Sequence, residues 1–162
     1  MDQTHIHLVI THLPIFGSIL GGCVLFYGLW TKSDETKIAA YGLFIISSIG
    51  ASIAYLTGEA AEERVEHLPG IIETTIERHE DFAIYALVSL IILGLSSILS
   101  LFLTLRKSPA TRTLAFVILF VSLVSFGLVA RTGYLGGQIR HSEISNVPAA
   151  PVDNTESEGD DE

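Results

Sequence analysis

Four long stretches of this chain contain no Asp, Glu, Lys or Arg and approach the length that crosses a bilayer. They cover residues 5–30, 38–57, 82–105 and 113–130. About 20 apolar residues in an α-helix span the hydrocarbon core of a membrane. The chain is also 49% hydrophobic and only 17% charged, which is unusual for a soluble protein. We therefore predict an all-α membrane protein whose four transmembrane helices pack as an up-down-up-down bundle.

The longest connection, residues 58–81, is predicted to carry an amphipathic segment between the second and third helices. A helix over residues 59–68 places its apolar side chains on one side and carboxylates on the others, as in helices that lie on a membrane surface. Pro69 and the glycine after it then interrupt the helix. Beyond this break, apolar residues at helical spacing continue through His79 into the third span, so we expect His79 on the inward face near the membrane boundary.

The end of the chain differs in composition from the rest. Residues after Gln138 include seven acids together with Pro, Ser and Asn, and almost no large apolar side chain. Such a segment cannot bury enough apolar surface to fold. We predict a transmembrane domain over residues 1–141 and a disordered acidic tail over residues 142–162. The acidic tail and the net charge of −9 also argue against nucleic acid as a partner.

Basic side chains outside the four spans fall at two ends. The larger group shares one end: Lys32, Lys37, Arg106, Lys107 and Arg112. All three lysines belong to this group, so the positive-inside rule predicts that this end is cytoplasmic. We therefore expect a protein of a plasma (inner) membrane, with both termini and residues 58–81 on the outer side.

All histidines of the chain fall at the predicted outer end: His5, His7, His12, His67, His79 and His141. Ionisable groups at a membrane boundary are rare and need a partner, a cofactor or water. Neutral imidazole is a common metal ligand and a common axial ligand of haem. His12 and His79 lie on apolar faces of the first and third spans, which predicts that they hold haem b between them. Arg131 and Arg140 lie near the same boundary, where they could pair with haem propionates.

His7 precedes His12 by five residues, so helix geometry points it about 140° away from His12. One cofactor therefore cannot easily use both residues. If both are ligands, the chain holds two haems, and His141 is the natural partner of His7. Two other interpretations stay open. The histidines could be solvated interfacial residues without a ligand, or a site for iron, copper or zinc could draw on carboxylates and on His7, His12, His67, His79 and His141.

Three short motifs point to a known family. They are His7-Leu-Val-Ile-Thr-His12-Leu-Pro14-Ile15, Glu77-Arg-His79-Glu80 and Gly133-Tyr-Leu-Gly136-Gly137-Gln-Ile-Arg-His141. Together they resemble the motifs of a bacterial membrane-protein family that is catalogued as domain of unknown function twenty-two thirty-one. The chain departs from the family pattern at Leu8, Leu13 and Ser142. The resemblance implies four membrane helices, histidine roles for the four histidines in these motifs, and a redox role with bound haem or metal.

These features predict a small b-type cytochrome-like protein, with one or two haems held by histidine pairs near the outer face. It would act as an electron carrier or redox subunit rather than as a stand-alone enzyme. Its partners would be membrane lipid and either a quinone or a redox protein, and a homo-oligomer is compatible with the pattern. The alternative from a different class is a non-redox accessory or structural membrane subunit whose outer segment and acidic tail dock a partner.

Overall fold

The computed structural model describes residues 3–63 and 73–140, and every regular element within them is an α-helix. The elements are α1 (Gln3–Ile10), α2 (His12–Thr31), α3 (Asp34–Leu56), α4 (Gly58–Glu62), α5 (Glu73–Leu105) and α6 (Thr111–Arg140). The predicted acidic tail, residues 64–68 of the predicted amphipathic helix, His67 and His141 lie outside the described residues.

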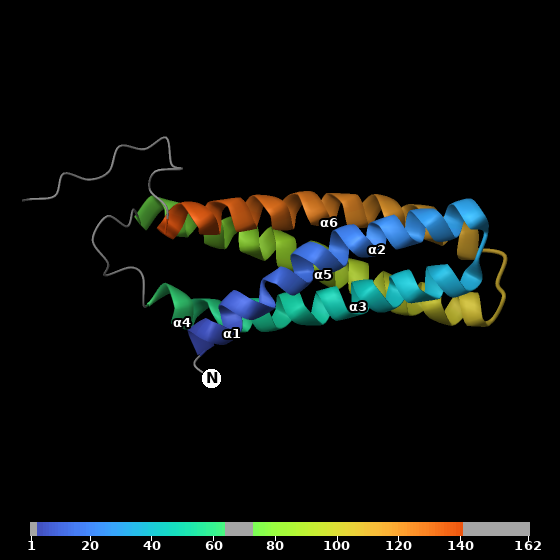
Figure 1. Cartoon of the computed structure of the whole chain (residues 1–162), viewed down its shortest axis with the longest axis horizontal. Helices are drawn as coiled ribbons and strands as arrows, with labels where there is room; N and C mark the ends of the chain where they lie inside the picture. Colours follow the sequence, from blue (N-terminus) through green and yellow to red (C-terminus); the bar gives the residue numbers. More distant parts are fainter. Residues whose placement is uncertain (1–2, 64–72, 141–162) are drawn as a thin grey trace, which may run out of the picture.

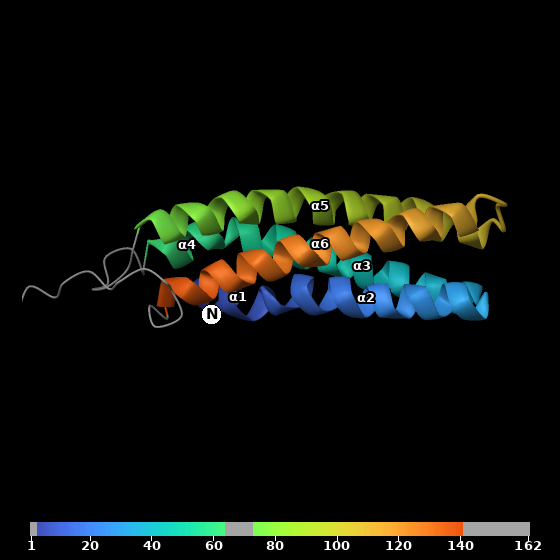
Figure 2. The same cartoon turned by 90° about the horizontal axis from the view of Figure 1, so that it is seen from above.

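Four long helical units lie side by side as a bundle (Figure 1). The first unit is α1 followed by α2, and the others are α3, α5 and α6. α2 and α5 each pack against both α3 and α6, and the view from above shows the same bundle along its length (Figure 2). Each unit is long and apolar enough to cross a membrane. The predicted all-helical class is therefore confirmed, and so is the prediction of four long apolar helices.

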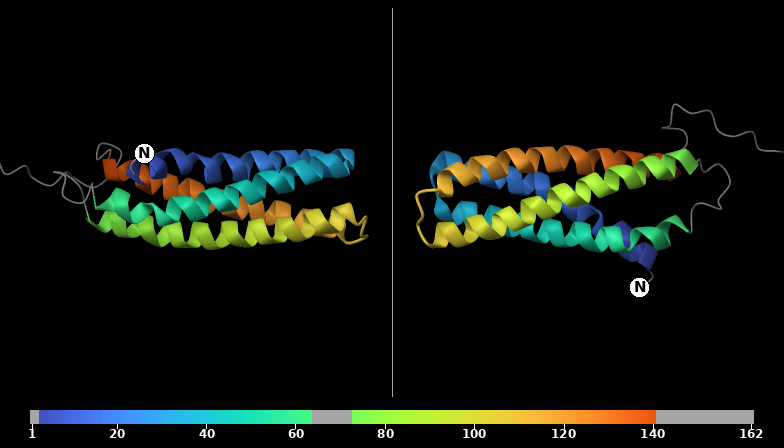
Figure 3. Two further views of the ribbon diagram at one scale, coloured as in Figure 1. Left: turned by 90° about the horizontal axis from the view of Figure 1, so that it is seen from below. Right: turned by 180° about the vertical axis from the view of Figure 1, so that it is seen from behind.

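The two ends of the bundle carry different residues. The histidine end contains α1, α4, the start of α5 and the end of α6, which lie together in Figure 3. The lysine end contains the turn at residues 32–33 and the turn at residues 106–110. The end of α5 at Leu105 agrees with the predicted third span, and α6 extends to Arg140, within the predicted transmembrane domain of residues 1–141.

The first span is not the single continuous helix that we predicted. α1 ends at Ile10, and α2 begins after a break at Thr11. Pro14 accounts for the break, because it has no N–H to bond the carbonyl of Ile10 and its ring crowds the preceding turn. The Pro14 carbonyl accepts hydrogen bonds from Ser18 Oγ at 2.7 Å and, across the interface with α3, from Ser47 Oγ at 3.2 Å. The break is thereby tied to the neighbouring helix.

The connection between α2 and α3 is shorter than the predicted residues 31–37. Ser33 caps α3, since its Oγ accepts a hydrogen bond from the backbone N–H of Thr36 at 3.2 Å. The acidic first turn of α3 further favours a helix start at this position. Lys37 is consequently helical and buried, with its ammonium 2.6 Å from the carboxylate of Asp34.

Large apolar side chains cover the outer surface of the bundle, unlike in a typical soluble protein. Large apolar side chains such as Trp30, Leu95 and Phe120 point outward and are more than 60% exposed. The interior combines apolar side chains with several buried hydroxyls, among them those of Ser47 and Ser97. An outward apolar surface and an interior with small and hydroxyl-bearing residues are characteristic of helices that pack within lipid.

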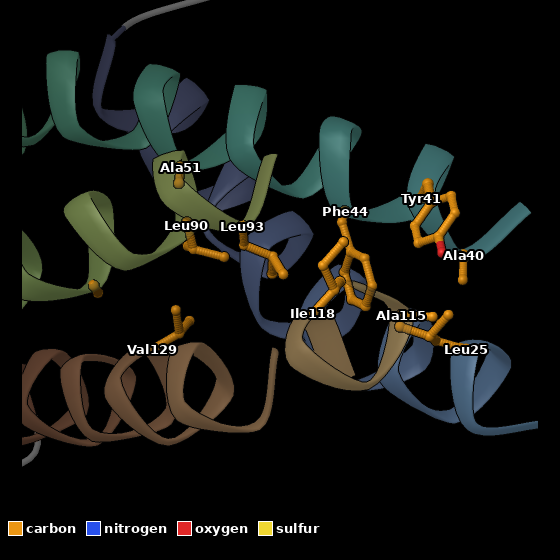
Figure 4. Close-up of a cluster of buried hydrophobic side chains, with 11 residues drawn as sticks. Leu25, Ala40, Tyr41, Phe44, Ala51, Leu90, Leu93, Ala115, Ile118 and Val129 are labelled. Carbon is orange, nitrogen blue, oxygen red and sulfur yellow. The ribbon is translucent and has the colours of Figure 1, made fainter. Parts of the chain in front are cut away.

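Glycines allow neighbouring helices to approach closely. A Cβ atom at Gly21 of α2 would lie 2.6 Å from Cε1 of Phe44 of α3, and one at Gly94 of α5 would lie 2.6 Å from Cβ of Ser48 of α3. Phe44 is fully buried and lies in the centre of the core (Figure 4). The ring of Phe44 therefore occupies the space that the missing side chain of Gly21 leaves.

We expect Gly21→Ala to destabilise the protein, because the added methyl group would overlap the Phe44 ring. Overpacking of this kind costs about 1–3 kcal/mol. Gly42→Ala is the matched control, since Gly42 is also helical and has no described neighbour within 4 Å of its Cβ position. It should be neutral or stabilising by up to about 1 kcal/mol. Thermal unfolding of both variants in detergent would test this, and equal melting temperatures would contradict it.

Candidate functional site

His7 links α1 to α3. Its Nδ1 lies 2.8 Å from the backbone carbonyl oxygen of Ala54 and 3.4 Å from Oγ1 of Thr57. The imidazole also packs near Gly58, where a Cβ atom would lie 3.7 Å from Cε1 of the ring. α1 is held against α3 and α4. His7 of the first histidine motif therefore lies where α1, α3 and α4 meet.

His79 links α5 to α6 in the corresponding way. Its Nδ1 lies 3.0 Å from the backbone carbonyl oxygen of Thr132. Its ring packs on Gly136, where a Cβ atom would lie 3.1 Å from Cε1. The side chain is half-buried, so the predicted inward placement of His79 is confirmed. The glycine beneath the ring is therefore Gly136.

These two hydrogen bonds fix the tautomer of each imidazole. A backbone carbonyl oxygen only accepts, so Nδ1 of His7 and Nδ1 of His79 must each carry a proton and donate it. In the neutral ring the lone pair then belongs to Nε2. Metal-binding histidines are commonly oriented by such a bond from the other ring nitrogen. Both residues are therefore held as Nε2 ligands would be.

His7 and His79 lie at the same end of the bundle but contact different helices. His7 bonds a carbonyl of α3, and His79 bonds a carbonyl of α6. α1 and the start of α5, which carry the two imidazoles, lie at the same end of the molecule in the views of Figure 3.

The prediction that His12 faces the interior is wrong. Its side chain is exposed, its Nδ1 lies 3.0 Å from the carbonyl oxygen of Leu8, and its ring stacks on Phe16 with 6.4 Å between centroids. Phe16 is itself exposed. The predicted divergence of His7 and His12 holds, but His7 is the one that faces the bundle. An apolar stripe cannot separate the two faces, because the outward face of this bundle is apolar as well.

The other predicted site residues lie around the same end. His5 is exposed on α1. Arg131 is exposed, and its guanidinium lies 5.7 Å from the ring centroid of Phe82 and 5.4 Å from that of Tyr134. Arg140 is the last residue of α6. Pairing of Arg131 and Arg140 with haem propionates stays a prediction.

Two imidazoles at the histidine end, those of His7 and His79, are held by backbone carbonyls of neighbouring helices. Within residues 3–63 and 73–140, no group of three or more His, Cys, Asp or Glu side chains is placed to hold a metal ion. An open hollow of about 290 Å³ lies beside α1 and α4, with Glu59 and Glu63 on its wall. Two imidazoles are the protein ligands that a bis-histidine haem needs.

Sequence reasoning missed a group of polar side chains at the lysine end. Lys37 and Tyr41 of α3 are buried, as are Ser97, Ser100 and Thr104 of α5. A usable signal was present, because residues 97, 100 and 104 are three and four apart and share one helix face. This signal was overlooked because the three residues lie in a span that is otherwise apolar.

We expect His79→Ala to lower the melting temperature, because it removes the hydrogen bond that joins α5 to the Thr132 carbonyl. One such bond contributes about 0.5–1.5 kcal/mol, and about 1 kcal/mol shifts the melting temperature of a chain of this size by about 2–4 °C. His79→Asn should retain much of the stability, since its Nδ2 can donate from the position of Nδ1. His12→Ala, at an exposed ring, is the control. A melting temperature for His79→Ala equal to that of His12→Ala would contradict the assigned role.

In comparisons with known proteins, no family model matches the chain, and no match is found among curated proteins or solved structures. The resemblance of the three motifs to a family therefore stays a prediction.

Proposed function

We propose that this protein is a small integral membrane electron carrier of the b-type cytochrome kind. His7 and His79 would supply the two axial ligands of one haem b at the histidine end. The observation that carries the proposal is the hydrogen-bonding pattern that the two imidazoles share. Each donates Nδ1–H to a backbone carbonyl of another helix, Ala54 or Thr132, and so keeps Nε2 available.

The surroundings of the two rings are suited to such a ligand. Each imidazole packs beside a glycine, Gly58 or Gly136, and at Gly136 an added Cβ atom would lie only 3.1 Å from the ring of His79. Ala54 and Ala86 are buried small residues of α3 and α5 on the same side of the bundle. Arg131, held between two aromatic rings, supplies a cation at the boundary that suits a propionate. The residues present therefore fit a bis-histidine haem.

Haem iron would supply one-electron transfer at this site. The chain would hold both imidazoles neutral and fixed in direction, because their backbone hydrogen bonds leave little freedom to rotate. Buried apolar side chains such as Ile76 and Leu135 would limit access of water to the site. The electron donor or acceptor would be a quinone in the membrane or a redox protein beyond it.

A spectrum of the purified protein tests this proposal. From cells that make haem in excess, the reduced-minus-oxidised spectrum should show the bands of a low-spin bis-histidine haem. His7→Asn and His79→Asn should each abolish these bands, since asparagine can replace Nδ1 as a donor but has no counterpart of Nε2. His12→Asn is the matched control and should retain them. Absence of the bands in folded wild-type protein would refute the proposal.

A structural role for the same histidines is the second candidate. The observation that favours it is that His7 and His79 already bind backbone carbonyls and join pairs of helices. The protein would then be a non-redox accessory membrane subunit. This role predicts that the asparagine variants are as stable as the wild type and that the wild-type protein contains no haem, which the same spectra and melting curves would show.

We also propose an up-down-up-down bundle in a bacterial inner membrane, with the lysine end in the cytoplasm. Support comes from the side chains at the turns, where Lys32 and Lys107 lie at the same end. Alkaline phosphatase fused after Glu162 should then be active, because this enzyme folds only outside the cytoplasm. A fusion at residue 109, in the turn between α5 and α6, should be inactive. The opposite pattern of activities would reverse the assigned orientation.

A further inference from the structure

A series of buried hydroxyl groups lies in the interior of the bundle, from mid-length toward the lysine end. We call it the hydroxyl tract, and its members are Tyr41, Ser97, Ser100, Thr104 and Ser125. Each side chain is at most 3% exposed. The hydroxyls of Ser97, Ser100 and Ser125 have no hydrogen-bond partner in the part of the chain that the structure describes, and those of Tyr41 and Thr104 have no partner there other than each other.

The tract is continuous toward the lysine end. Ser97 and Thr104 are separated by two turns on one face of α5, a rise of about 10 Å. The hydroxyl of Tyr41 interacts across the interface with Thr104, and Figure 4 shows this hydroxyl directed into the bundle. Lys37 precedes Tyr41 by one turn of α3, and its partner Asp34 has a side chain that is 57% exposed. A polar path therefore leads from the surface at Asp34 to the middle of the molecule.

Other hydroxyls of the same helices behave differently. Ser89 and Ser96 of α5 and Ser122 of α6 each donate to a carbonyl three residues earlier in their own helix, at 2.8–3.0 Å. This bond is the usual way in which a helix satisfies a serine in apolar surroundings. The hydroxyls of the tract do not make this bond within their own helices. A buried hydroxyl without a partner is unfavourable, so the tract requires a ligand that can both donate and accept.

We propose that the hydroxyl tract binds a chain of water molecules that is continuous with the aqueous phase at the lysine end. Water suits the site, because each hydroxyl can donate and accept, and buried waters typically bridge polar groups of this kind. The chain enters beside Lys37 and Asp34 and ends near Ser97 and Ser125. The titratable groups that face it are Lys37, Asp34 and Tyr41. Protons from the lysine side thereby have access to the middle of the bundle, whether or not the histidine end holds haem.

Hydroxyl-radical footprinting of the full chain in lipid nanodiscs tests for this water, because radicals formed from bound water label adjacent aromatic rings. Tyr41 should be labelled several-fold faster than Phe44, although both are fully buried on the same helix. Phe120, which points outward from α6, is the lipid-facing control and should be labelled slowly. Labelling of Tyr41 no faster than that of Phe44 would overturn the proposal.

A double variant provides a second measurement. Ser100→Ala with Thr104→Val removes two hydroxyls at nearly constant shape. If water bridges these groups, the variant should have a lower melting temperature and slower labelling of Tyr41. If the interior is dry, removal of unpartnered hydroxyls should raise the melting temperature, and that result would refute the proposal. Ser96→Ala is the control, since the Ser96 hydroxyl already bonds the Leu93 carbonyl at 3.0 Å.

Discussion

Close contact at small residues is the interaction on which this bundle depends. Its outward surface is apolar, so burial of further apolar surface between helices gains little over contact with lipid chains. The helices must instead gain from dense packing and from hydrogen bonds between them. Gly21 against Phe44 and Gly94 against Ser48 bring α2 and α5 close to α3. The bond from Ser47 to the carbonyl of Pro14 adds a polar link at the level where the first span breaks.

Hydrogen bonds between helices are also important at the histidine end. A histidine at a membrane boundary must satisfy its ring nitrogens, and His7 and His79 do so with carbonyls of neighbouring helices. Each bond joins two helices and at the same time fixes the direction of Nε2. The hydrogen bond that links two helices therefore also orients the imidazole ring. For this reason, replacement of the histidine by asparagine separates the two roles better than replacement by alanine does.

Much of the fold could be predicted from the sequence, because spans of about 20 uncharged apolar residues leave few alternatives in a membrane. The end of the third long helix at Leu105 also followed from the sequence pattern. The orientation of His12 did not, since lipid-facing and core-facing positions are both apolar and periodicity cannot tell them apart. The break at Thr11 and the early start of α3 depend on local chemistry, at Pro14 and at the Ser33 cap, which hydropathy alone does not weigh.

The interior contains both hydroxyl groups and apolar side chains, and the apolar ones limit how the two ends of the bundle can communicate. Ala51, Leu90, Leu93 and Val129 are buried in the core (Figure 4). None of these four side chains has an atom that can relay a proton. Water that enters from the lysine side would therefore be held only where hydroxyl groups line the interior. Under the proposed function, the imidazoles of His7 and His79 would exchange protons with the aqueous phase at their own end.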